Sequence, residues 1–468
     1  MRNNFEITSM KLLNGIEKLF KLFLPTPFTI AILITIVTFF LAFSLTDSDL
    51  DSGSRGIELV GFWYEGLWKQ SLLAFAVQMM LMLVLGHAVA LTKPVDRFMS
   101  YVTRFCNDTA TSAFTVTLLT ILVSLFNWGL GLIFGAILAR KVGERAAANN
   151  IKLNYALIGA AGYSGLMVWH GGISGSAPIK ASEPGHIASL MEGVLNPEQL
   201  ASLPKSIPMT DTVFGTMNLV VMLMLLICVP LFMFWMGKRS KKADNLPITT
   251  SNEEEEVCTD STKIDSSPWF STGVAVLICT YACYVAISSI VKGENFLIPN
   301  FINFTLLGLG LLLHSNIHGF LKAIDQAIRG ASGILIQFPL YFGIMGLMIG
   351  SGLIQVFSDF FVEISTEVSF PIYSFISAGI VNVFVPSGGG QWGVQGPIII
   401  QSAMELGVSI PKSIMALAYG DQLTNMLQPF WALPLLGITG LKAKSILPYT
   451  LLMMLLGATI YLIALFIF

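Results

Sequence analysis

Two long apolar stretches of this chain are interrupted near their middle by glycine and small polar residues. The first interruption covers residues 126–131 (FNWGLG) and the second covers residues 382–393 (NVFVPSGGGQWG). Backbone that leaves helical geometry inside a bilayer has N–H and C=O groups without partners, so it persists only where it lines a watery cavity or holds a solute. Corresponding interruptions in the two halves of a chain are typical of a transporter's binding site.

The composition is that of an integral membrane protein. Of 468 residues, 54% are hydrophobic and only 12% are charged, which is far more apolar than a soluble protein of this length. A membrane-spanning helix needs about 20 mostly apolar residues. About nine runs approach this length, and we predict a spanning helix for each: residues 23–45, 70–92, 153–170, 213–236, 269–291, 296–314, 331–350, 412–440 and 445–468.

The charges of the short loops predict the topology, because lysine and arginine concentrate on the cytoplasmic side. Residues 1–22 are basic and residues 46–69 are mainly acidic, so the first helix runs from the cytoplasm outward. The loops at 93–108 and 140–152 are both basic, and both therefore belong in the cytoplasm. The segment between them, residues 109–139, enters and leaves by one face. We predict a re-entrant hairpin there, with legs too short to span.

A second re-entrant hairpin is predicted at residues 370–403. Acidic residues flank this segment, and no lysine or arginine occurs between Arg329 and Lys412. The second hairpin is therefore expected to enter from the outside, opposite to the first. The same reasoning places the N-terminus in the cytoplasm and the C-terminus outside.

Landmarks recur in the same order in the two halves. Asn127 lies 36 residues before Tyr163, and Asn382 lies 37 residues before Tyr419. The helix at 269–291 is unpaired, so the second half is threaded in the opposite sense. The alternative is that the glycines only help helices to pack.

The predicted fold is an all-α polytopic membrane protein, an inverted-repeat secondary transporter with two re-entrant hairpins and two broken helices. Its parts are a cytoplasmic N-terminus (1–22), a first repeat (23–236), a flexible cytoplasmic linker (237–268), a connecting helix (269–291) and a second repeat (296–468).

The interruptions predict a site for an anion. Hairpin tips and helix breaks direct helix N-termini and free N–H groups at the midplane, where their partial positive charge favours a carboxylate. These segments contain no lysine or arginine, so a single carboxylate fits better than a di- or tricarboxylate. Aromatic residues (Trp128, Trp169, Trp392, Phe430 and Trp431) could wall an acyl tail, or could serve only in packing. The candidate substrate-binding residues are Asn127, Trp128, Gly129, Gly131, Ser174, Gly175, Ser176, Asn382, Pro386, Ser387, Gly388, Gly389, Gly390, Gln391 and Trp392.

Asp421 is the candidate for ion coupling. A carboxylate in the middle of residues 412–440, with no lysine or arginine nearby, is costly in a bilayer and functional by default. Together with Gln422, Thr424 and Asn425 it could ligate Na⁺ or exchange a proton; the alternative is a hydrogen bond to a facing helix for packing.

The sequence resembles the bacterial short-chain fatty acid transporter family over nearly the whole chain. The resemblance lies in residues 127–129 (NWG), 171–176 (GGISGS), 385–390 (VPSGGG), 418–422 (AYGDQ) and 428–434 (QPFWALP). It implies uptake of short monocarboxylates such as acetoacetate or butyrate across the bacterial cytoplasmic (inner) membrane. It also implies kinship with the ion transporter superfamily, elevator-type motion and a homodimer. His170 departs from the family pattern, in which a small residue is expected.

The function predicted is ion-coupled secondary transport of short-chain fatty acid anions, with Na⁺ or H⁺ as the coupling ion and no other cofactor. The alternative is a dicarboxylate carrier or a cation/proton antiporter of related fold. An enzyme is not expected, because no HExxH motif, His/Cys metal spacing or GxSxG elbow occurs. A channel would leave the hairpins static. The expected partners are the substrate and the lipid bilayer, and no nucleic acid.

Overall fold

The structure, a computed structural model, describes residues 27–46, 51–240, 263–292, 296–384 and 387–468. Regular structure in these ranges is helical, and β pairing is limited to one isolated bridge. Six of the described helices are long and apolar enough to cross a membrane, and three further apolar helices are shorter. Each of the nine apolar runs of the sequence corresponds to a helix or to a broken helix. The prediction of a polytopic all-α membrane protein is therefore confirmed.

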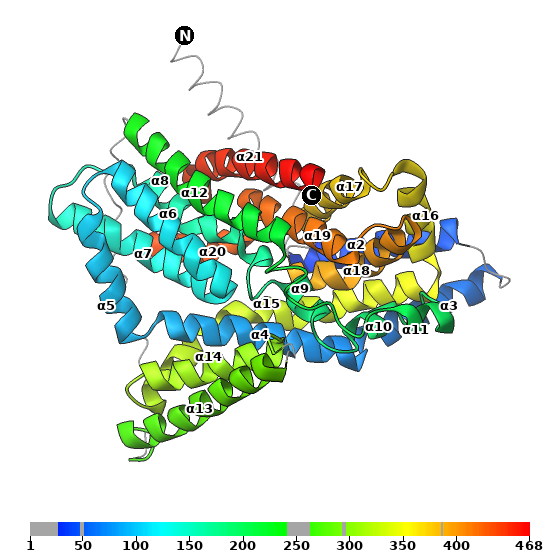
Figure 1. Ribbon diagram of the computed structural model, residues 1–468, viewed down its shortest axis with the longest axis horizontal. Helices are drawn as coiled ribbons and strands as arrows, with labels where there is room; N and C mark the ends of the chain where they lie inside the picture. Colours follow the sequence, from blue (N-terminus) through cyan, green and yellow to red (C-terminus); the bar gives the residue numbers. More distant parts are fainter. Residues whose placement is uncertain (1–26, 47–50, 241–262, 293–295, 385–386) are drawn as a thin grey trace, which may run out of the picture.

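A long antiparallel helix pair runs through the molecule. One side consists of α3 (Ser52–Leu67) and α4 (Gln70–Ala90), and the other is α15 (Ile317–Gly350) (Figure 1). Gly66 and Gly346 let the backbones of α3 and α15 touch, since a Cβ at Gly66 would lie 2.8 Å from the Cα of Gly346. Such close crossings are typical of membrane helices.

Three more helices pack with α3, α4 and α15, and we call these six helices the scaffold. α2 (Pro27–Leu45) contacts α15, and α14 (Pro299–Leu313) contacts α4. α13 (Pro268–Lys292), the predicted connecting helix, packs on α14 and projects from the body of the molecule (Figure 1). Most of its apolar side chains are exposed, as expected of a helix surrounded by lipid.

The first predicted hairpin, called hairpin 1 below, is formed by α6 (Thr109–Phe126) and α7 (Trp128–Ala148), which pack together. Only Asn127 leaves helical geometry between them. The predicted leg lengths were wrong, because α7 continues through the basic segment that was expected to be a loop. An Arg140–Glu144 ion pair, one turn apart at 2.7 Å, supports this exposed extension. The short α5 (Lys93–Val102) and η1 (Thr103–Phe105) precede the hairpin.

The second predicted hairpin, called hairpin 2 below, is formed by α17 (Phe370–Phe384) and α18 (Gly388–Glu405), close to the expected bounds. α16 (Leu353–Ile364) leads into it and packs on α18. The two hairpins lie at opposite ends of the molecule, and both point toward its middle (Figure 1).

Two broken helices follow the hairpins, and we call their interruptions the first break and the second break. The first passes from α8 (Tyr155–Tyr163) through the short 3₁₀ turns η2 (Ser164–Met167) and η3 (Trp169–Gly171) to α9 (Ser176–Ala181). The second passes from α19 (Ile410–Thr424) through η4 (Asn425–Leu427) to α20 (Pro429–Thr439). α10 (His186–Met191) and α11 (Pro197–Ser202) then lead to α12 (Thr216–Arg239), and α21 (Ala443–Ile467) ends the second half.

The element order of the second half thus repeats that of the first, and the matching helices α4 and α15 run antiparallel, as an inverted repeat requires. The predicted N-terminal segment 1–22 and most of the predicted linker 237–268 lie outside the described residues.

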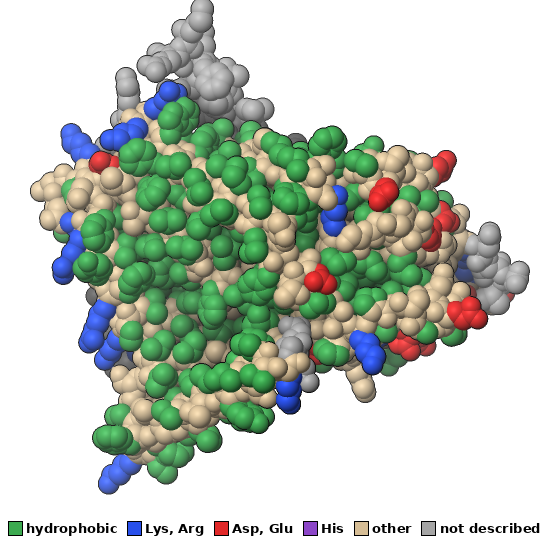
Figure 2. Space-filling view, in the orientation of Figure 1, with side chains coloured by type: hydrophobic (Ala, Val, Ile, Leu, Met, Phe, Trp, Pro, Cys, Tyr) green, Lys and Arg blue, Asp and Glu red, His purple; other side chains and the backbone are tan. Residues whose placement is uncertain are grey.

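Charged side chains separate toward the two ends of the molecule. Lysine and arginine gather at the end that carries α5 and α7, whereas aspartate and glutamate gather at the end that carries α3 and α16 (Figure 2). The broad surface between these ends is mostly hydrophobic. This is the distribution of a protein embedded in a bilayer, with its helices running from one charged end to the other.

Candidate functional site

The tips of both hairpins and the breaks of both broken helices meet around one cavity. The space between these elements that atoms do not fill is about 350 Å³, open solvent included. Scaffold helices α4 and α15 close it on the other side. The lining residues are Met79, Trp128, Leu166, Trp169, Ser176, Phe338, Ser387, Gly388, Gly389, Asn425 and Trp431.

Three tryptophans form one wall of the cavity. The ring of Trp128 lies 5.6 Å from that of Trp169 and 5.4 Å, edge to face, from that of Trp431. These residues come from hairpin 1, the first break and α20, so the wall exists only when the three elements are together. The predicted wall also included Trp392, which is instead buried with its Nε1 donating to His186 Nε2 at 2.9 Å. The side chain of Phe430 lies outside the described residues.

Two residues that line the cavity carry N–H donors that have no acceptor among the described residues. The indole Nε1 atoms of Trp128 and Trp169 are buried and have no hydrogen-bond partner among the described residues. At the start of α18, Ser387 Oγ accepts from the amide of Gly390 at 3.3 Å. The amides of Gly388 and Gly389 precede this capped amide at the helix N-terminus, and both residues line the cavity. Buried donors without partners indicate a missing acceptor.

The tip of hairpin 1 is held by two side-chain caps. Asn127 Oδ1 accepts from the amide of Leu130 at 2.8 Å, and Ser174 Oγ accepts from the amide of Trp128 at 2.9 Å. Ser174 thereby ties the first break to the hairpin instead of facing the cavity. Gly129 and Gly131 have the same positioning role. A Cβ on Gly129 would lie 2.9 Å from the Cα of Leu83 in α4, and a Cβ on Gly131 would overlap Ser124 of α6.

The three glycines of hairpin 2 are required by packing. A Cβ would meet Trp169 and His170 at Gly388, the rings of Phe338 and Phe75 at Gly389, and Tyr341 at Gly390. None of the three has a positive φ. The conformational freedom of glycine is therefore not what these positions use; they use its lack of a side chain. Pro386 lies outside the described residues.

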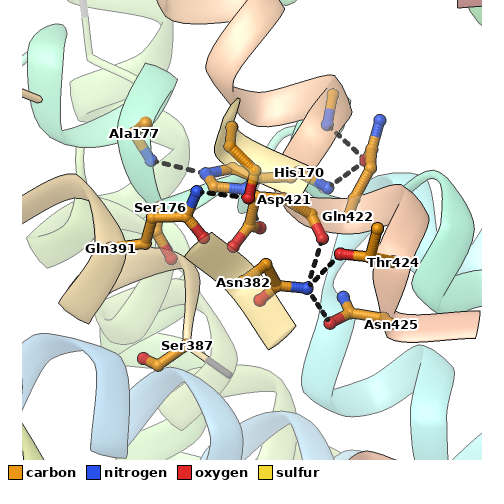
Figure 3. A network of polar contacts seen from close by, with 12 residues as sticks. His170, Ser176, Ala177, Asn382, Ser387, Gln391, Asp421, Gln422, Thr424 and Asn425 are labelled. Atoms are coloured by element: carbon orange, nitrogen blue, oxygen red, sulfur yellow. Dashed lines mark hydrogen bonds and ion pairs between the residues drawn. The ribbon is translucent and has the colours of Figure 1, made fainter. Parts of the chain in front are cut away.

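A buried His170–Asp421 pair joins the two broken helices next to the cavity (Figure 3). His170 Nδ1 lies 2.5 Å from Asp421 Oδ2, and both side chains are fully buried. His170 Nε2 accepts from the amide of Ala177 at 2.9 Å. Gln422 Oε1 accepts from the amides of His170 and Gly171, so this predicted ion-coupling residue holds the first break in place.

A second polar cluster surrounds the amide of Asn382. Its Nδ2 lies 2.6 Å from the backbone oxygen of Asp421, 2.9 Å from Thr424 Oγ1 and 3.0 Å from Asn425 Oδ1. Of the predicted ion-coupling side chains, Thr424 and Asn425 therefore come together around Asn382, whereas the carboxylate of Asp421 pairs with His170 and Gln422 bonds to the first break (Figure 3). Asn382, predicted to donate to substrate, donates to the second break instead, and its backbone oxygen accepts from Gln428 Nε2.

The remaining predicted residues divide between the cavity and its supports. Ser176 lines the cavity, and its Oγ lies 3.5 Å from Met79 Sδ. Gly175 permits a tight turn, because a Cβ there would overlap the backbone of His170. Gln391 donates to the backbone oxygen of Ala378 at 2.9 Å, and its own Oε1 has no partner among the described residues.

Sequence reasoning missed Lys180, which is 4% exposed. Its ammonium pairs with Glu183, donates to Gln78 Oε1 at 3.1 Å and lies 5.4 Å from the centre of the Phe75 ring. Its position could have identified it as a candidate, because Lys180 lies only four residues after the GGISGS segment.

Comparison with known proteins identifies the family of this chain. The profile of the Short chain fatty acid transporter family matches residues 10–468. A Haemophilus influenzae protein provisionally assigned as a short-chain fatty acid transporter is 35% identical over 452 residues, which are 95% of this chain and 96% of that protein. An Escherichia coli protein with the same assignment is 34% identical over 453 residues, 95% of this chain and 96% of its own length.

Two solved structures share the fold. The Alcanivorax borkumensis YdaH transporter, described as having an unusual topology, gives a TM-score of 0.59 at 16% identity, covering 95% of this chain and 97% of its own. Neisseria gonorrhoeae MtrF, described with a class of antimetabolite efflux pumps, gives a TM-score of 0.53 at 12% identity, covering 97% and 96%. At these identities the likeness concerns the fold alone. From the match along nearly its whole length, the chain belongs to the short chain fatty acid transporter family.

Proposed function

We propose that this protein is a secondary active carrier that moves short monocarboxylate anions, of the acetoacetate or butyrate class, across the cytoplasmic membrane together with a coupling ion. The observation that carries the proposal is the cavity between the hairpin tips. Its wall is mainly aromatic and aliphatic, and its unpartnered polar atoms are N–H donors. A carboxylate is an acceptor without protons to donate, and a short acyl tail suits the apolar wall.

The absence of charge among the lining residues favours one carboxylate over two. None of the described lining residues is lysine, arginine, aspartate or glutamate. Lys180 lies one turn beyond Ser176, but its ammonium is already engaged by Glu183. A second carboxylate would have to be desolvated without a cation to compensate it, which is costly. This argues against the dicarboxylate alternative.

The charge distribution supports the proposed orientation. The basic end, with α5 and α7, would face the cytoplasm, and the acidic end, with α3 and α16, would face outward. In this orientation hairpin 1 enters from the cytoplasm and hairpin 2 from outside. α21 then ends on the outer side. We propose a bacterial inner-membrane location and a homodimer on the basis of family membership.

Alternating access would move the hairpins and broken helices, as one transport domain, past the scaffold. The second leg of each hairpin contacts the scaffold: α7 packs on α4, and α18 packs on α15. Glycines at these contacts keep the surfaces smooth, as at Gly129 against Leu83 and Gly390 against Tyr341. Two matching smooth contacts are what a sliding, elevator-type motion requires.

The function is tested by counterflow in proteoliposomes. The purified chain is reconstituted with unlabelled butyrate inside, and entry of dilute radiolabelled butyrate is followed without an ion gradient. We expect saturable counterflow that is competed by acetoacetate and not by succinate. Competition by succinate and not by acetoacetate would favour the dicarboxylate alternative. Sodium- or potassium-driven proton movement without any carboxylate would favour the antiporter alternative.

A further inference from the structure

The buried His170–Asp421 pair lies beside the cavity and contains the carboxylate predicted to couple an ion. Among the described residues, the only cationic or histidine side chain within ion-pair distance of Asp421 is His170. The pair lies against the substrate cavity. A Cβ placed on Gly388, which lines that cavity, would be 2.8 Å from His170 Cε1. The imidazole therefore stands between the tip of hairpin 2 and the carboxylate.

The hydrogen bonds of the imidazole fix its tautomer. Nε2 accepts from the backbone amide of Ala177, so this nitrogen carries no proton. The proton of the neutral ring must then be on Nδ1, where it is donated to Asp421 Oδ2. In this arrangement His170 is neutral, Asp421 is an anion, and the pair has a net charge of −1.

The second oxygen of the carboxylate is the unusual feature. Asp421 Oδ1 is buried and has no hydrogen-bond partner among the described residues. In the view of Figure 3 the carboxyl lies between Gln391 and Asn382. The Gln391 Oε1 and Asn382 Oδ1 atoms are also buried acceptors without a partner. A carboxylate oxygen can only accept, so Asp421 Oδ1 becomes a hydrogen-bond donor only when it takes up a proton.

The other titratable groups around α19 are occupied elsewhere. From α21, Tyr461 donates to the backbone oxygen of Met167 at 2.7 Å. On α19 itself, Tyr419 donates to Asn218 Oδ1 at 2.9 Å. From α9, Lys180 pairs with Glu183. α17 and α18 contribute the neutral amides Asn382 and Gln391, and η3 contributes His170. None of these described groups supplies a positive charge to Asp421.

We propose that transport is coupled to protons, that Asp421 Oδ1 binds the transported proton, and that His170 is a positioning residue that orients the carboxylate. The proposal rests on the proposed function and specifies its coupling ion. One proton adds to Oδ1 as an O–H bond, and no other bond changes. The pair then becomes neutral, which removes the repulsion between Asp421 and an anion bound in the cavity. By linkage, a bound anion raises the affinity for the proton to the same degree. One proton moving with one monocarboxylate is electroneutral.

The first test imposes the two gradients separately on proteoliposomes containing the full chain. A pH gradient without sodium should drive accumulation of radiolabelled acetoacetate, and a sodium gradient at equal pH should not. Protein-free liposomes measure passive diffusion of the protonated acid, which is subtracted. Accumulation driven by sodium alone would overturn the proposal and assign coupling to the oxygens around Asn382. Absence of counterflow under any condition would instead reject the proposed function.

The second test separates the two members of the pair. Asp421→Asn should lower the ratio of pH-driven accumulation to counterflow by about tenfold or more, because an amide cannot take up the proton. His170→Gln keeps a donor toward Asp421 but does not titrate. It should retain pH-driven accumulation with a displaced pH profile. If His170→Gln abolishes accumulation while Asp421→Asn preserves it, the imidazole carries the proton and the assignment to Asp421 is wrong.

A direct measurement avoids dependence on transport rates. The purified carrier is mixed with butyrate in weakly buffered detergent solution containing a pH indicator. We expect uptake of up to about one proton per carrier by the unmutated protein and none by Asp421→Asn. Thermal unfolding of each variant confirms that it is folded. Equal proton uptake by folded Asp421→Asn would contradict the proposal.

Discussion

At the scale of single residues, the tryptophans that line the cavity and the glycines of the hairpin tips have different roles in the site. Trp128 and Trp169 present both an apolar ring and an N–H group without a partner. The glycines of hairpin 2 allow Phe338, Tyr341 and Trp169 to approach the backbone of the tip. Side chains are thus needed at some tip positions, and their absence is needed at others.

Replacing Trp128 by phenylalanine tests the N–H contribution. Trp128→Phe keeps the aromatic wall but removes the indole donor, so the KM for butyrate should rise about tenfold or more. The maximal rate should change less. KM and maximal rate are measured from counterflow per unit of folded carrier. A KM equal to that of the unmutated protein would exclude this donor from the carboxylate site.

Replacing Gly389 by leucine tests the tip itself. The added side chain would collide with Phe338 and Phe75 and fill the cavity, so uptake should be abolished while much of the folded protein remains in the membrane. Gly437→Leu is the matched control, because a Cβ at Gly437 in α20 meets no atom within 4 Å. Near-normal uptake by Gly389→Leu would refute the proposed site.

At the scale of elements, glycine crossings set the spacing between helices. Gly66 of α3 meets Gly346 of α15 in the scaffold, Gly135 of α7 meets Gly162 of α8, and Gly420 of α19 meets α17. In each case one backbone occupies the space where the other helix would need a Cβ. The two hairpins are therefore fixed to their own broken helices by the same device.

The close contact between Gly66 and Gly346 should make the crossing of α3 and α15 intolerant of a side chain. Gly346→Ala should destabilise the folded carrier by about 1–3 kcal/mol, because its Cβ would lie 2.6 Å from the Cα of Gly66. Gly61→Ala, on α3 where a Cβ meets nothing within 4 Å, should be neutral. The measurement is thermal or denaturant unfolding in detergent. Equal stability of both variants would show that α3 can move away from α15.

At the scale of the whole molecule, opposite entry of the two hairpins follows from the inverted repeat. The second half repeats the element order of the first, and the helices α4 and α15 run antiparallel. The hairpin tips therefore meet in the middle from opposite ends (Figure 1). One cavity built by both repeats can then open to one side of the membrane and afterwards to the other.

Cysteine labelling tests the orientation. In a variant without the five native cysteines, Asn149→Cys, just past the end of α7, should react with a membrane-impermeant maleimide only after the cytoplasmic face is opened. Glu405→Cys, at the end of α18, should react in intact cells. Both native side chains are exposed, so accessibility does not limit the reaction. Labelling of Asn149→Cys in sealed cells would refute cytoplasmic entry of hairpin 1.

The sequence determined the features that a bilayer imposes locally. Spanning segments must be apolar over about 20 residues, and helix breaks must carry residues that tolerate them. The nine runs, a break within each predicted interruption (126–131 and 382–393) and the isolation of Asp421 from lysine and arginine could therefore be predicted, although residues 128–131 and 388–393 are helical. The length of α7 could not, because charged residues end an apolar run without ending a helix.

Only the tertiary structure decided which side chains meet. His170 and Asp421 are separated by 251 positions in the chain, and no local pattern relates them. Ser174 and Asn382 looked like substrate donors, yet packing directs them to Trp128 and to the second break. A polar side chain bonds to whatever group the neighbouring helix presents. That group is set by the packing of the whole molecule, so identity and spacing along the chain do not reveal it.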